Sequence, residues 1–140
     1  MQIDLVYLFT SVHGRITREQ FWIGMLFVVL AEIAGHWLAF RIQGEKLDSI
    51  VGLALNYPEF VLAVKRANDR DLPAWQIAVF FVGDTLLGFV GLLGYGTTDA
   101  AGLMQIVIDL YLLVLLADLG LRRGTVGPNR FGPDPLAGKA

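Results

Sequence analysis

Four carboxylic acids stand inside long apolar stretches of this 140-residue sequence, and their position makes them the first candidates for chemistry. Each lies near the middle of a different stretch, and a histidine follows the first acid by one helical turn; the residues are Glu32, His36, Glu59, Asp84 and Asp109. An ionised side chain in the middle of a membrane-spanning helix costs about 2.5–3.5 kcal/mol, so such residues should face a bundle interior or water. They indicate either an ion or proton pathway or, when protonated, hydrogen bonds between helices. We favour the second interpretation; a third is that a span is wrongly assigned or that these residues lie at the membrane interface.

A second set of polar residues lies in three strings outside the apolar stretches, at residues 14–22, 65–75 and 124–135. The strings combine guanidinium, carboxylate and amide groups, and the candidate residues are Arg15, Arg18, Arg66, Asp69, Asn129, Arg130 and Asp134. Arginines oriented by carboxylates bind phosphate groups in a bidentate manner, so one hypothesis is a site for a phosphate or a lipid headgroup. The other, which we favour, is that the arginines set the membrane topology and that ion pairs hold the loops and tail against the helices. We expect these residues to meet in one cluster.

The sequence offers few signals for catalysis. It has no cysteine, which excludes a thiolate zinc site and a cysteine nucleophile. Its two histidines are His13 and His36. It contains no G-x-S-x-G, H-E-x-x-H or P-loop string. We therefore predict no catalytic residues, no metal site and no cofactor, and an enzymatic function is open but less favoured. A formal net charge of −2 gives no general attraction to nucleic acid.

The elements that must position these residues follow from the composition. Hydrophobic residues make up 55% of the chain and charged residues 17%, and a soluble domain of this size cannot bury that much apolar surface. A bilayer core needs about 20 mainly apolar residues per helix, and four stretches qualify: residues 21–40, 47–64, 75–93 and 100–121. They lack the alternation of barrel strands. The predicted fold is an all-α membrane protein, a bundle of four transmembrane helices.

Two flanking segments complete the expected organisation. Residues 1–20 form an N-terminal segment with a short interfacial helix over residues 3–9, which is an apolar run too short to span a bilayer. Residues 21–121 form the transmembrane domain. Residues 122–140 form an irregular tail, because their Gly and Pro density prevents the last helix from continuing.

The orientation follows from the cationic residues in the short loops. Nine of the 11 Lys and Arg residues fall in the N-terminal segment, the central loop and the tail, whereas Arg41 and Lys46 fall between the first two spans. Both termini are therefore expected to be cytoplasmic. Thr17 and Gln20 have the spacing of a capping box at the start of the first span.

The three strings resemble the pattern of a bacterial inner-membrane family, domain of unknown function 805. That pattern is Gly-Arg-x-x-Arg-x-x-Phe/Tyr-Trp, then Arg-x-His-Asp followed by Trp, then Gly-x-Asn-Arg-Phe-Gly-Pro-Asp-Pro. The matching residues are Gly14, Arg15, Arg18, Phe21, Trp22, Arg66, Asp69, Trp75, Gly127, Asn129, Arg130, Phe131, Gly132, Pro133, Asp134 and Pro135. Asn68 stands where the family has its histidine. The resemblance covers essentially the whole chain and implies a multi-pass protein of the bacterial inner membrane, with no established activity.

Three functions from different classes are consistent with the sequence. The first choice is a scaffold or accessory protein that self-associates or contacts lipid headgroups, so the expected partners are membrane lipid and a second copy of the chain, with no nucleic acid. The second is a small proton or cation pathway that uses the mid-membrane carboxylates. The third is a membrane enzyme that acts on a phosphorylated headgroup. A wet cavity that reaches the acids would favour the second function, whereas a sealed bundle would not.

Overall fold

The protein is almost entirely helical. The structure, a computed structural model, describes residues 4–42, 44–96 and 98–137. Over these residues the chain forms five helices and no strand: α1 (Leu5–Thr10), α2 (Arg18–Arg41), α3 (Glu45–Asp69), α4 (Trp75–Leu92) and α5 (Asp99–Leu121). The four longer helices are long and apolar enough to cross a membrane. The predicted all-α class and its four apolar helices are confirmed.

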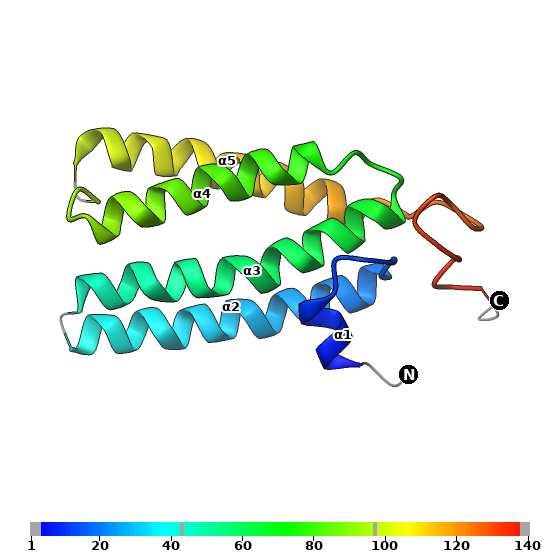
Figure 1. Ribbon diagram of the computed structural model, residues 1–140, viewed down its shortest axis with the longest axis horizontal. Coiled ribbons are helices and arrows are strands. Elements are labelled where there is room, and N and C mark those ends of the chain that lie inside the picture. The colour runs from blue at the N-terminus through cyan, green and yellow to red at the C-terminus, as the bar shows by residue number, and fades with distance from the viewer. Residues whose placement is uncertain (1–3, 43, 97, 138–140) are drawn as a thin grey trace.

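The four long helices lie side by side and run back and forth (Figure 1). Both described chain ends and the connection between α3 and α4 lie at one end of the bundle, which we call the termini end. The connections from α2 to α3 and from α4 to α5 lie at the opposite, or far, end. Helix α3 is central, because it packs against α1, α2, α4 and α5.

Local sequence accounts for where several helices begin. Thr17 caps α2 in a complete capping box with Gln20, as the sequence predicts. Thr98 accepts a hydrogen bond from the Ala101 amide at the start of α5. The end of α3 is less obvious from sequence, because the helix continues through charged residues to Asp69 instead of stopping with the apolar run near residue 64.

The apolar core lies mainly toward the termini end, where Phe21, Leu62, Ile77 and Leu119 are almost fully buried. The outer faces of the long helices expose large apolar side chains, as expected for helices surrounded by lipid; Phe27 and Leu113 are examples. Small residues let two of the helices approach closely, since a Cβ added to Gly24 of α2 would lie 2.7 Å from the Leu62 side chain of α3.

Candidate functional site

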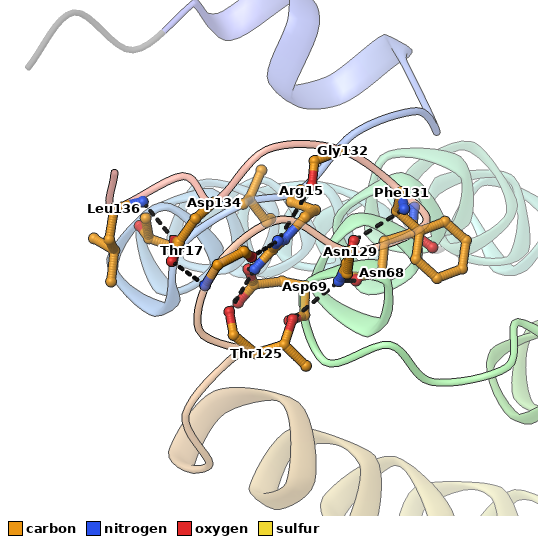
Figure 2. Close-up of polar contacts among 12 residues, drawn as sticks. Arg15, Thr17, Asn68, Asp69, Thr125, Asn129, Phe131, Gly132, Asp134 and Leu136 are labelled. Carbon is orange, nitrogen blue, oxygen red and sulfur yellow. Dashed lines mark hydrogen bonds and ion pairs between the residues drawn. The ribbon is translucent and has the colours of Figure 1, made fainter. Parts of the chain in front are cut away.

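A buried ion cluster stands at the termini end, where Asp69 pairs with both Arg15 and Arg66. Figure 2 shows Arg15 beside Asp69. The Arg15 Nε atom donates a 3.0 Å hydrogen bond to Asp69 Oδ1, and Arg66 Nη1 donates to Asp69 Oδ2. The side chains of Arg15 and Arg66 are each 1% exposed, and that of Asp69 is 5% exposed. The cluster thus joins the segment before α2 to the last turn of α3, away from solvent.

The remaining donors of the two arginines are occupied by backbone carbonyls. Arg15 donates to the carbonyls of Thr125 and Gly127, both at 2.7 Å. Arg66 donates at 2.7 Å to the Leu119 carbonyl in α5 and at 2.6 Å to the carbonyl of Arg122. Within the part of the chain that is described, no buried side-chain nitrogen or oxygen lacks a partner. Arg15 and Arg66 therefore connect the segment before α2, the end of α3, the end of α5 and the tail.

Amide side chains fasten the tail to the same place (Figure 2). Asn129 Nδ2 donates at 2.9 Å to the Asn68 carbonyl, and the Thr125 amide donates at 2.8 Å to the Asp69 carbonyl. The Asn68 side chain in turn donates at 3.1 Å to the Gly14 carbonyl. The sequence marked Asn68 only as a departure from a family pattern, yet it links the N-terminal segment to α3.

Three of the predicted cluster residues lie apart from the buried ion pair. Arg18 donates at 3.2 Å to the Leu121 carbonyl, and Arg130 forms an exposed 2.8 Å pair with Asp71. Asp134 accepts backbone hydrogen bonds from Leu136 and Gly127, at 2.9 and 2.8 Å. These two bonds favour the ionised carboxylate and lower the pKa of Asp134. Asp134 thus closes a turn in the tail instead of orienting an arginine.

Lys65 is a fully buried cation, although its position in the sequence indicates only the cytoplasmic side of a span. Its Nζ atom donates to the carbonyls of Tyr7 and Leu8 at 2.6 and 2.7 Å, and it lies 4.3 Å from the centre of the Tyr7 ring. Both carbonyls belong to α1, so the ammonium group joins α1 to α3. A lysine at the end of an apolar run could not be assigned such a partner from sequence.

The second polar site is a cavity of about 570 Å³ among the four long helices. All of the intramembrane polar residues singled out in the sequence line it: Glu32, His36, Glu59, Asp84 and Asp109. We call it the acid-lined cavity. Since α2, α3, α4 and α5 each contribute at least one acid, the four mid-helix carboxylates face a shared space inside the bundle.

Several of these acids have polar partners within the cavity lining or next to it. Asn56 Nδ2 donates at 2.7 Å to Asp84 Oδ2, and Gln105 Nε2 donates at 2.8 Å to Asp109 Oδ1. His36 Nδ1 lies 2.6 Å from Asp48 Oδ1 of α3. The spacing of one helical turn between Glu32 and His36 did not indicate this partner. Amide donors thus hold the mid-helix carboxylates of Asp84 and Asp109, whereas the histidine holds Asp48 near the far end.

The lining of the cavity differs between its two ends. His36 and Asp48, near the far end, have side chains that are 44% and 56% exposed. Phe80 and Leu112 line the other limit of the cavity, and the packed core that includes Phe21 lies beyond them. Among the described residues, no group of three or more His, Asp or Glu side chains could hold a metal ion.

Comparisons with known proteins agree with the motifs. A family model described as "Protein of unknown function (DUF805)" matches residues 9–133. In Escherichia coli strain K12, "Uncharacterized protein YiiR" is 33% identical over an alignment of 132 residues that covers 89% of this chain and 85% of that protein. "Inner membrane protein YhaH" of the same strain is 23% identical over an alignment of 133 residues that covers 91% of this chain and 88% of that protein. No solved structure matches the chain.

Proposed function

The chain belongs to the DUF805 family, and from that premise we propose that it is a small inner-membrane protein that provides a pathway for protons or small cations. No activity is attached to the family, so the proposal is carried by one observation. The carboxylates in the middle of the four long helices line a single cavity, and the lining near the far end includes the exposed side chains of His36 and Asp48.

The energetics of acids in a membrane favour an ion pathway over a role limited to hydrogen bonds between helices. Acids that serve only as interhelical hydrogen-bond donors need one partner each and no common space. Four acids around a cavity of about 570 Å³ instead provide room for several waters, each of which occupies about 30 Å³ in the liquid. Water inside the cavity offsets the desolvation of an ionised carboxylate. A scaffold, which was the first choice from the sequence, makes no use of such a cavity.

The proposed orientation places both termini in the cytoplasm, because the positive residues concentrate at the termini end. In this orientation the acid-lined cavity is accessible from the periplasmic side, and α1 lies at the cytoplasmic interface with Leu5 and Val6 exposed toward lipid. Passage across the whole membrane then requires the helices to separate at the core beyond Phe80.

Flux measurements in proteoliposomes test the pathway. Under an imposed potential the native protein should carry H⁺, Na⁺ or K⁺, and Glu59→Gln or Asp84→Asn should abolish the flux while leaving thermal stability almost unchanged, because each neutral side chain keeps its hydrogen-bonding shape. Glu19→Gln, an exposed acid at the termini end, is the matched control and should keep the flux. Native protein without flux of any of the three ions would remove the pathway and favour the scaffold.

A further inference from the structure

A second pocket, of about 150 Å³, lies at the termini end beside the buried ion cluster. We call it the arginine pocket, and its lining is Thr17, Arg18, Arg66, Asp69, Arg123, Gly124, Thr125, Val126, Asp134, Pro135 and Leu136. Figure 2 shows Thr17, Asp134 and Leu136 together on one side of Arg15. The tail forms one wall of the pocket, and the start of α2 forms another.

The charges available in this pocket come from Arg18 and Arg123. Arg66 and Asp69 also line it, but they are buried, and Asp69 pairs with both Arg66 and Arg15. The Asp134 carboxylate is held by two backbone amides. Arg18 uses one Nη atom for its 3.2 Å bond to the Leu121 carbonyl, and both Arg18 and Arg123 are exposed. Their guanidinium groups therefore present further N–H donors to a bound anion.

The position of Trp22 indicates the level at which the arginine pocket lies in the membrane. The Trp22 indole donates at 3.2 Å to the Gly120 carbonyl, and Trp22 is 44% exposed, as is typical of an aromatic residue at the membrane interface. Arg18 precedes Trp22 by one helical turn, and Arg123 follows Gly120 by three residues. Both arginines thus lie just outside the aromatic level, where lipid phosphates are found.

Exposed apolar side chains also lie at the rim of the arginine pocket. Val126 is 97% exposed and Leu136 is 56% exposed, and both line the pocket. Exposed apolar groups beside arginine donors match a ligand that has a phosphate next to hydrocarbon, whereas a soluble anion would use the arginines alone.

We propose that the arginine pocket binds a phosphate group through Arg18 and Arg123, with the headgroup of an anionic phospholipid as the source that the rim favours. The site is separate from the acid-lined cavity, so its occupancy does not depend on ion flux. It also differs from the phosphate site considered from the sequence, because Arg15 and Arg66 are excluded by their own contacts.

Binding to the full-length protein in detergent tests the proposal. The probes are short-chain phosphatidylglycerol, phosphatidylcholine with the same acyl chains, and inorganic phosphate, with binding followed by native mass spectrometry and calorimetry. Arg18→Gln and Arg123→Gln should each weaken phosphatidylglycerol binding by about tenfold, because each removes a charge-assisted hydrogen bond donated by an exposed side chain. Arg41→Gln, an arginine at the far end, is the control and should bind like the native protein.

Each outcome decides something. Phosphatidylglycerol bound in preference to phosphatidylcholine, and not displaced by inorganic phosphate, identifies the lipid headgroup. Inorganic phosphate bound with equal strength and lost in the same two variants identifies a soluble phosphate. Equal binding of both lipids without phosphate binding, native-like binding by both variants, or an equal loss in Arg41→Gln would overturn the proposal.

Discussion

At the residue scale, two aspartates near the end of α3 have opposite environments. Asp69 is buried between Arg15 and Arg66, whereas Asp71 forms an exposed pair with Arg130. Removing one partner of a buried pair leaves an uncompensated charge, while exposed pairs contribute little. The two side chains have the same chemistry, so their comparison isolates the effect of burial.

We expect Asp69→Asn to lower the free energy of unfolding by about 3–5 kcal/mol, because two buried guanidinium groups lose their counter-charge. Asp71→Asn should change it by about 0–1 kcal/mol, and Asn tolerates the positive φ of 56° at this position. Unfolding in mixed detergent micelles measures both variants. Equal effects from the two substitutions would show that the buried cluster does not hold the termini end together.

At the element scale, the contact between α2 and α3 depends on the absence of a side chain at Gly24. We expect Gly24→Ala to lower the free energy of unfolding by about 1–3 kcal/mol, because its Cβ would approach two methyl carbons of the fully buried Leu62 at 2.7 and 2.9 Å. Gly52→Ala in α3 is the control. No atom lies within 4 Å of its added Cβ, and a helical Gly→Ala change is favourable by about 0.5–1 kcal/mol. The same detergent unfolding assay compares them, and a neutral Gly24→Ala would contradict the close approach.

Hydropathy predicted the existence of the long helices better than their ends and their polar contacts. In lipid, an apolar run of about 20 residues satisfies its backbone hydrogen bonds by forming a helix, so the four helices could be predicted from hydropathy. The end of α3 could not be predicted from hydropathy, because Lys65 and Arg66 are buried only where carbonyls of α1 and α5 accept their hydrogen bonds. Likewise, His36 lies against Asp48 of the next helix, a contact that depends on how α2 and α3 pack and not on spacing within α2.

At the scale of the whole molecule, the arrangement of helices predicts how the chain lies in the membrane. Reporter fusions after Asp69 and at Ala140 should report the cytoplasmic side, and fusions at Gly44 and Tyr95 the periplasmic side, because four crossings alternate from a cytoplasmic N-terminus. Fusions within the same loop should agree with each other and serve as the internal control. Asp69 and Ala140 reporting on opposite sides would mean that one of the four helices does not span.

The contacts of Arg15 also have a consequence for how the protein is made. Its carbonyl partners at Thr125 and Gly127 lie 110 and 112 residues later in the chain. The ribosome therefore synthesises all four apolar helices before it adds the residues whose carbonyls accept from this arginine. Chains that end prematurely just after α5 have every crossing but retain a guanidinium without its carbonyls. Chains that lack residues 125–127 are thus expected to remain incompletely folded at the termini end even when all four apolar helices are present.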